Sequence, residues 1–302
     1  MKKLLLLPAA LGGCGAVFAA ELYRYTFRRE SSALLAPFLD KKGHEEAYYR
    51  KRDAAAEELR RLPHETIRIR SERGNLLAGH YYPLAGEGRR IVFLMHGYRS
   101  EHAETAGLFR SLYEGLGFDL FCCDQTAHGE SEGRQIGFDF YEARDGLLWL
   151  DELRRRFGDE IRIILHGFSM GSATVMKMSA DCPPQVRFIV ADCGYASAEK
   201  QLSASLGALY PLMNGMNRAI AGYDLRETDV RPSLSRARLP ILFVHGTDDP
   251  TVSFDDSKTL FHDYQGPKDC FFVEGAKHME CIYLDPEGYA EKLRSFVRTY
   301  IS

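Results

Sequence analysis

The stretch that decides the fold runs from residue 161 to residue 178, "IRIILHGFSMGSATVMKM", with Ser169 near its centre. Its first half is a continuous apolar run, which is typical of a strand buried on both faces, and its second half has the composition of a helix. Gly167 and Gly171 flank the serine at the two positions where a tight strand-to-helix turn leaves no room for side chains. The pattern predicts a turn that presents Ser169 as a nucleophile. A glycine-rich turn with an incidental serine is the alternative.

Strand-like runs recur on both sides of this stretch. Segments 65–70 and 76–82 are expected to form a hairpin, and further apolar runs occupy 91–97, 118–124, 187–193, 241–246 and 270–275. Segments of helical length separate the runs, so we expect an α/β fold with a mostly parallel eight-stranded sheet flanked by helices. Residues 195–238 are too long for a simple crossover and predict a small helical cap insertion. Its Leu, Met and Tyr side chains either line an apolar pocket or pack the cap onto the sheet.

The composition bounds the class of protein. The chain has 302 residues, 45% of them hydrophobic and 27% charged, with a net charge of −3, as in ordinary globular proteins. Without a basic excess or zinc-finger spacing, a nucleic-acid partner is not expected. The seven cysteines are odd in number and lack CxxC spacing, which favours buried, reduced thiols.

The amino terminus allows three interpretations. Residues 1–25 carry Lys2 and Lys3 near their start and continue as a mostly apolar segment, which is typical of a membrane anchor or a cleaved signal peptide. "LGGC" ending at Cys14 resembles a lipoprotein processing site. We predict a single membrane anchor over 1–25, a helical stalk over 26–62 and a catalytic domain over 63–302. Basic residues on both sides of the anchor leave its orientation undecided, and the reduced thiols favour the cytoplasmic face. The oligomeric state is not fixed by the sequence.

A serine nucleophile needs a base and an acid. His278 follows the last predicted strand in "FFVEGAKHME", and either Asp248 or Asp249 follows the preceding strand in "HGTDDPTV". Because the carboxyl ends of parallel strands meet at one edge of a sheet, Ser169, the acid and His278 are expected to lie together. The order serine, acid, histidine is the one used by hydrolases built on such a turn.

Five segments together resemble the α/β-hydrolase superfamily, in particular its bacterial, often membrane-anchored, serine aminopeptidase-like and lysophospholipase-like branch. They are "LMHGYRS" at 94–100, "DQTAHGESEG" at 124–133, "GFSMG" at 167–171, "HGTDDPTV" at 245–252 and "GAKHME" at 275–280. The resemblance spans residue 65 to the end of the chain. It implies Asp249 as the acid of the triad, and an oxyanion hole made by the backbone N–H groups of Tyr98 and Met170.

Segment 124–133 departs from the family pattern, because Thr126 and Ala127 stand where the family has Arg and Gly. Asp124, His128 and Ser131 are expected to order this loop. The histidines of the chain lack metal-ligand spacing, so no metal is expected. Acyl transfer through a serine, a histidine and an acid needs no cofactor, and none is expected.

The expected function is hydrolysis of a carboxylic ester, with a hydrophobic or lipid-like acyl group, through an acyl-enzyme. A serine peptidase or aminopeptidase would use the same triad, with a carboxylate such as Glu101, Glu199 or Glu227 holding the substrate's amino terminus. A non-catalytic binding module on a hydrolase fold is the third possibility.

Overall fold

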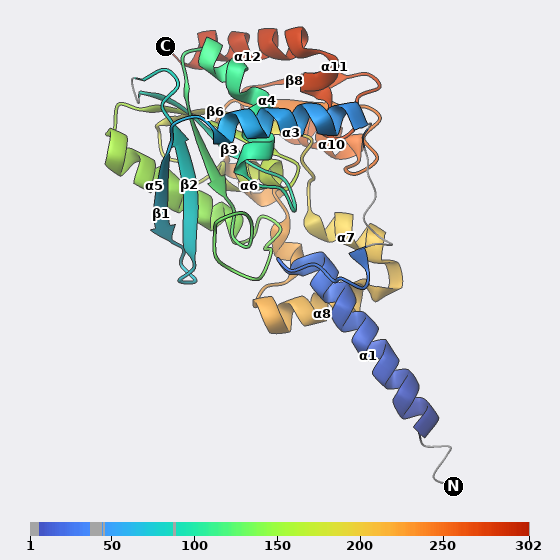
Figure 1. Cartoon of the computed structure of the whole chain (residues 1–302). Helices are drawn as coiled ribbons and strands as arrows, with labels where there is room; N and C mark the ends of the chain where they lie inside the picture. Colours follow the sequence, from blue (N-terminus) through green and yellow to red (C-terminus); the bar gives the residue numbers. More distant parts are fainter. Residues whose placement is uncertain (1–5, 37–43, 45, 87–88, 302) are drawn as a thin grey trace.

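One eight-stranded sheet forms the centre of the molecule (Figure 1). The computed structural model describes residues 6–36, 44, 46–86 and 89–301. The strands are β1 (Glu65–Arg70), β2 (Leu76–Tyr82), β3 (Arg90–Met95), β4 (Asp119–Asp124), β5 (Arg162–Phe168), β6 (Val186–Asp192), β7 (Ile241–Gly246) and β8 (Lys268–Val273), in the spatial order β1-β2-β4-β3-β5-β6-β7-β8. The β1–β2 and β2–β4 pairs are antiparallel and all other pairs are parallel. The predicted fold class is confirmed.

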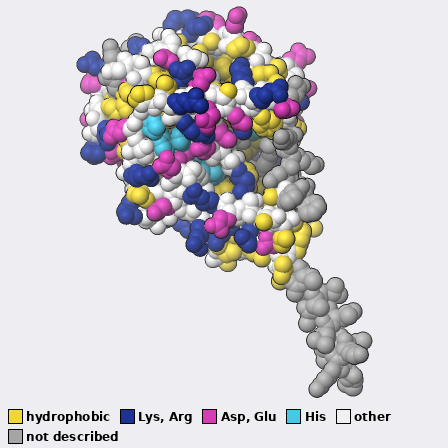
Figure 2. Space-filling view, in the orientation of Figure 1, with side chains coloured by type: hydrophobic (Ala, Val, Ile, Leu, Met, Phe, Trp, Pro, Cys, Tyr) yellow, Lys and Arg dark blue, Asp and Glu magenta, His cyan; other side chains and the backbone are white. Residues whose placement is uncertain are grey.

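Helices cover both faces of the sheet. On one face lie α3 (Glu46–Arg60), α4 (His102–Gly115), the short α11 (Cys281–Leu284) and α12 (Pro286–Tyr300), and on the other lie α5 (Glu142–Phe157), α6 (Met170–Met178) and α10 (Phe254–Asp263). The core is therefore two apolar layers, and strands β3 to β7 are buried between them, which explains their continuous apolar sequences. Basic and acidic side chains are interspersed over most of the face in Figure 2.

The insertion between β6 and β7 is helical, as the sequence predicts. It contains α7 (Ala198–Leu206), α8 (Tyr210–Ala221) and α9 (Arg231–Arg236), together with 3-10 turns at Gly207–Leu209 and Leu225–Thr228. Met213 and Leu225 are buried, so part of the apolar content of the cap packs onto the domain.

The helices that precede the sheet are attached to the domain. Within the stretch predicted as a stalk, α3 packs against α4 and buries Tyr48, Ala56 and Leu59. The longer α1 (Leu6–Phe27) extends away from the body at its amino-terminal end, and its last turns lie near α8 (Figure 1).

The prediction of a membrane-anchored protein is wrong. Within the described residues, no helix is both long enough and apolar enough to cross a bilayer. The last turns of α1 carry Glu21 and Arg24, and their apolar side chains, such as Tyr23 and Phe27, are buried against the domain. The side chain of Cys14, the residue of the lipoprotein interpretation, lies outside the described part.

Candidate active site

Ser169 occupies a strained turn between β5 and α6. Its φ of 54° and ψ of −115° lie in a region that residues other than glycine rarely adopt. A Cβ added at Gly167 would lie 2.1 Å from the backbone oxygen of Gly171, and one added at Gly171 would lie 2.1 Å from that of Met95. The residues two positions before and two positions after the serine must therefore be glycine, for the steric reason that the sequence suggests.

Asp249 and His278 meet at the same edge of the sheet, on the loops that follow β7 and β8. The Nδ1 atom of His278 lies 2.6 Å from Oδ2 of Asp249. The Asp249 side chain is fully buried, and that of His278 is 11% exposed. Asp248 is exposed and accepts a hydrogen bond from the Thr247 hydroxyl instead. Of the two candidate acids, the structure brings Asp249 to the histidine.

The surroundings of Asp249 keep its carboxylate ionised. Burial alone would raise its pKa, but hydrogen bonds from His245 and His278 and from backbone N–H groups hold the pKa well below its usual range. The backbone N–H groups of Thr251 and Val252 donate to Oδ1 at 2.8 and 2.9 Å. A fixed negative charge of this kind can orient an imidazole and stabilise its protonated form.

Counted over the whole residue, backbone included, Ser169 and His278 are each 9% exposed. The hydrogen bonds among the described residues include none between the Ser169 hydroxyl and the His278 ring. In hydrolases without substrate this bond is often long, and it tightens when the substrate binds.

The two residues expected to form an oxyanion hole lie beside Ser169. Met170 is the first residue of α6, so its N–H cannot find a partner within that helix. The loop after β3 passes so close to the turn that a Cβ added at Gly97 would lie 3.3 Å from Cβ of Ser169. Tyr98 follows directly, and Tyr98, Met170 and Ser169 line one cavity.

This candidate catalytic cavity has a volume of about 570 Å³ and a mainly apolar lining. Its walls come from four parts of the chain: Leu22, Tyr25 and Thr26 of α1; Gln201, Leu202, Ser205 and Leu206 of α7; Tyr98, Phe138, Ser169, Met170 and Tyr195 of the domain; and Thr251 and Val252 after β7. None of these lining residues is a carboxylate. Glu101, Glu199 and Glu227, the sequence candidates for holding an amino terminus, are not among them.

The α1 wall is the part of the site that sequence analysis missed. Tyr98 donates its hydroxyl to the carbonyl oxygens of Tyr25 and Thr26, at 3.1 and 2.9 Å. The guanidinium of Arg99 donates to the carbonyl of Tyr25 and, at 3.1 Å, to that of Arg28. These bonds satisfy carbonyls that the end of a helix leaves without partners, and they join α1 to the loop beside Ser169.

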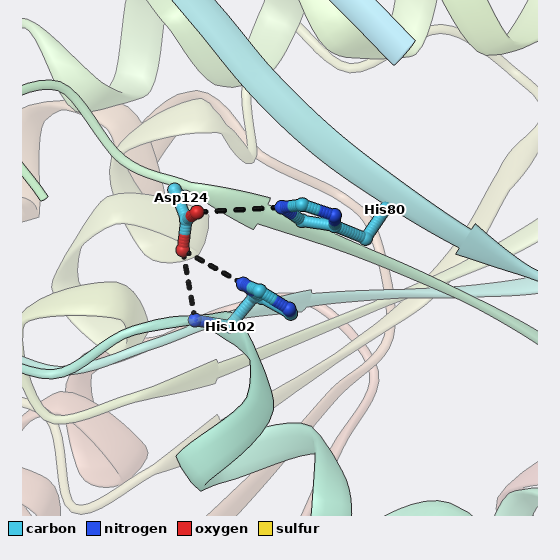
Figure 3. A group of neighbouring side chains, drawn as sticks. All are labelled: His80, His102 and Asp124. Carbon is cyan, nitrogen blue, oxygen red and sulfur yellow. Dashed lines mark hydrogen bonds and ion pairs between the residues drawn. The ribbon is translucent and has the colours of Figure 1, made fainter. Parts of the chain in front are cut away.

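A buried network holds the other end of that loop (Figure 3). The Asp124 carboxylate at the end of β4 lies 3.0 Å from Nδ1 of His102 and 3.3 Å from Nε2 of His80, and it accepts the His102 backbone N–H at 3.0 Å. Burial alone would raise the pKa of Asp124, but these bonds hold it well below its usual range. Asp124 thus anchors the start of α4. It also accepts the backbone N–H of Glu130 at 2.9 Å, which orders its own loop as expected.

His80, His102 and Asp124 are close enough to suggest metal ligands. However, the two rings are stacked, with centroids 3.7 Å apart and planes inclined by only 19°. A metal ion bound to an imidazole nitrogen lies in the plane of the ring, so one ion cannot lie in two such planes close to the nitrogens. The geometry is that of two donors to one carboxylate.

His128 and Ser131 also order the loop as expected. Nε2 of His128 accepts the backbone N–H of Arg99 at 3.1 Å, and the Ser131 hydroxyl accepts that of Ala78 at 2.9 Å. His96 accepts the backbone N–H of Gln125 at 3.0 Å and is 1% exposed, so its role is structural.

Comparisons with known proteins show what this chain is similar to. A family model described as serine aminopeptidase, S33, matches residues 86–220. The uncharacterized protein YqkD of Bacillus subtilis (strain 168) is 26% identical over 198 residues, which cover 63% of this chain and 65% of YqkD. The human alpha/beta hydrolase domain-containing protein 17B is 27% identical over 244 residues, covering 77% of this chain and 75% of that protein.

Solved structures with the same fold include esterases. The Pyrococcus furiosus esterase Pf2001 has a TM-score of 0.64 at 17% identity, covering 80% of this chain and 92% of the esterase. Est1E from Butyrivibrio proteoclasticus, solved with ferulic acid bound, has a TM-score of 0.60 at 17% identity, covering 78% of this chain and 99% of Est1E. At these identities the similarity establishes the fold.

Proposed function

Because this chain belongs to the α/β-hydrolase superfamily of enzymes, we propose that it is a serine esterase with Ser169, His278 and Asp249 as its triad. The observation that carries the proposal is the strained serine, which opens on an apolar cavity and lies at the same sheet edge as the 2.6 Å His278–Asp249 pair. The carboxylic ester is cleaved in two acyl-transfer steps.

In the first step, His278 takes the proton of the Ser169 hydroxyl as its oxygen attacks the ester carbonyl. The backbone N–H groups of Tyr98 and Met170 stabilise the negative charge on the carbonyl oxygen. When the tetrahedral intermediate collapses, His278 gives its proton to the departing alcohol. Water then attacks the acyl-enzyme, again with His278 as the base, and the acid leaves. Asp249 stabilises the imidazolium in both steps.

The lining of the cavity favours an ester with a hydrophobic acyl group. Its side chains are mainly apolar, and its volume of about 570 Å³ falls in the range of small-molecule sites. An aminopeptidase would need an anionic group to hold the free amino terminus, and the cavity lining offers none. Glu101 instead pairs with Arg60, and Glu227 caps a turn through the backbone N–H of Asp224.

The test uses the full chain, because α1 supplies one wall of the cavity. Wild-type protein and Ser169→Ala are treated with a fluorophosphonate probe and with p-nitrophenyl esters of increasing acyl length. We expect labelling and turnover in the wild type and neither in the variant. A folded wild-type protein that neither labels nor hydrolyses any ester of the series would refute the proposal and favour a binding module.

A further inference from the structure

A second cavity lies at the carboxyl end of α1. It has a volume of about 300 Å³ and is lined by Arg24, Arg28, Arg29, Glu30 and Arg134. Four arginines thus line one space together with a single glutamate. We call it the arginine cavity.

The backbone holds these arginines close to one another. The Arg29 N–H donates to the carbonyl of Arg134 at 2.9 Å, and residues Arg28 and Gln135 form an antiparallel bridge. The segment after α1 is therefore paired with the segment that carries Arg134. Like charges on paired segments destabilise a structure unless an opposite charge offsets them.

The protein itself neutralises little of this charge. Arg24 pairs with Glu21 at 3.2 Å, with its side chain 49% exposed. Within the described residues, Arg28, Arg29 and Arg134 form no ion pair with a carboxylate. The Arg29 guanidinium donates to the backbone carbonyls of Gly129 and Ser131, which fixes its position but leaves its charge uncompensated.

Cations near the carboxyl end of a helix interact favourably with the helix dipole, and this accounts for Arg24 and Arg28. It does not account for Arg134, which comes from a different segment and lines the same cavity. The convergence of two segments on one space is what a binding site for an anion requires.

We propose that the arginine cavity binds a phosphate monoester or a similar dianionic group. The planar guanidinium fork matches phosphate oxygens with paired hydrogen bonds. Four cations exceed what a single carboxylate ligand needs, whereas a dianion offsets more of their mutual repulsion.

The position of the site suggests where the anion comes from. One stretch of α1 places Leu22 and Tyr25 on the catalytic cavity and Arg24 and Arg28 on the arginine cavity. The anionic group is therefore either a separate phosphate compound or part of an ester substrate, and the second reading rests on the function proposed above.

Binding is tested first, with inorganic phosphate as the probe. Phosphate is titrated into the full chain by calorimetry at constant ionic strength, against chloride as the reference. We expect one bound phosphate per wild-type or Ser169→Ala chain, and at least a tenfold weaker affinity for Arg28→Gln/Arg134→Gln. The matched control is Arg294→Gln/Arg298→Gln, which removes the same charge from exposed positions of α12 and should bind like the wild type.

Absence of binding to the wild type, or equal loss in the control, would overturn the proposal. If the double variant does not fold, Arg134→Gln alone, at an exposed side chain, gives the same comparison. Because the Ser169→Ala protein is included, this result does not depend on whether the chain hydrolyses esters.

Kinetics then identify the source of the anion. A neutral p-nitrophenyl ester is compared with the same ester carrying a phosphate monoester group on the leaving group. A KM that rises at least fivefold in Arg28→Gln/Arg134→Gln for the anionic ester alone supports a substrate-borne anion. Unchanged KM values for both esters, with phosphate binding intact in the wild type, support a separate phosphate compound in the same site.

Discussion

The strain at Ser169 can be measured by replacing the serine with glycine. Ser169→Gly and Ser169→Ala both remove the hydroxyl, so both should lose esterase activity and probe labelling. They differ in one respect that matters here: alanine keeps a Cβ on a backbone with φ 54° and ψ −115°, and glycine does not. The difference in their stability therefore reports the strain of the turn.

A residue other than glycine in such a region costs about 1–3 kcal/mol. The greater freedom of glycine in the unfolded chain offsets about 0.4–1 kcal/mol of the gain. We therefore expect Ser169→Gly to be more stable than Ser169→Ala by about 1 kcal/mol. For a domain of this size that corresponds to a Tm higher by roughly 2–4 °C.

The control is the same pair of substitutions at Ser172, three residues along the chain in α6. There glycine should be less stable than alanine by about 1 kcal/mol, because the backbone is helical. Urea unfolding of the four variants gives the four free energies of unfolding. If glycine is less stable than alanine at both positions, the turn stores no strain and the steric account of this site fails.

Three further results are expected. Asp249→Asn should lower kcat about 10⁴-fold because it removes the charge that stabilises the imidazolium, whereas exposed Asp248→Asn should leave ester kinetics unchanged. Leu22→Ala should lower kcat/KM about tenfold for esters whose acyl chain reaches α1, through lost apolar contact, but should leave it unchanged for an acetyl ester. Val17→Ala, at a 61% exposed position of the same helix, should leave kcat/KM unchanged for both kinds of ester. Burial raises the pKa of Glu142 from 4.5 to about 7. The stability that its protonated side chain contributes to the folded state is therefore fully present below pH 4.5 and is lost as the pH rises to about 7. Glu142→Gln should therefore gain up to about 3 kcal/mol over the wild type between pH 4.5 and pH 8, measured by denaturant unfolding, and equal pH profiles would contradict this account.

The order of strands and helices could be predicted because each buried strand carries a continuous apolar run and each turn carries its glycine or aspartate. The carboxyl ends of parallel strands meet at one edge of a sheet, and Ser169, Asp249 and His278 all follow such ends. Their closeness could therefore be predicted. The residues alone could not distinguish Asp248 from Asp249. The two aspartates are adjacent in the chain, and only the folded loop decides that Asp249 turns inward and Asp248 outward.

The amino-terminal segment was misread for a physical reason. Apolar length is the property that membrane anchors share with helices that pack on a protein surface, and the contacts of α1 are distant in sequence. Tyr23 reaches Asn217, 194 residues away, at 3.4 Å, and Tyr98 binds carbonyls more than 70 residues before it. No local pattern around Leu22 or Tyr25 signals that they line a cavity completed by α7.

The docking of α1 also orders events during synthesis. Residues 6–28 leave the ribosome before their partners at residues 98, 135 and 217, which emerge progressively later. Closing such long loops is slow relative to local folding, because the chain entropy must be spent before the contacts form. The helix α1 is thus translated before its partners but is among the last segments to take its place, and the newborn chain gains a complete cavity wall only after the cap has been made.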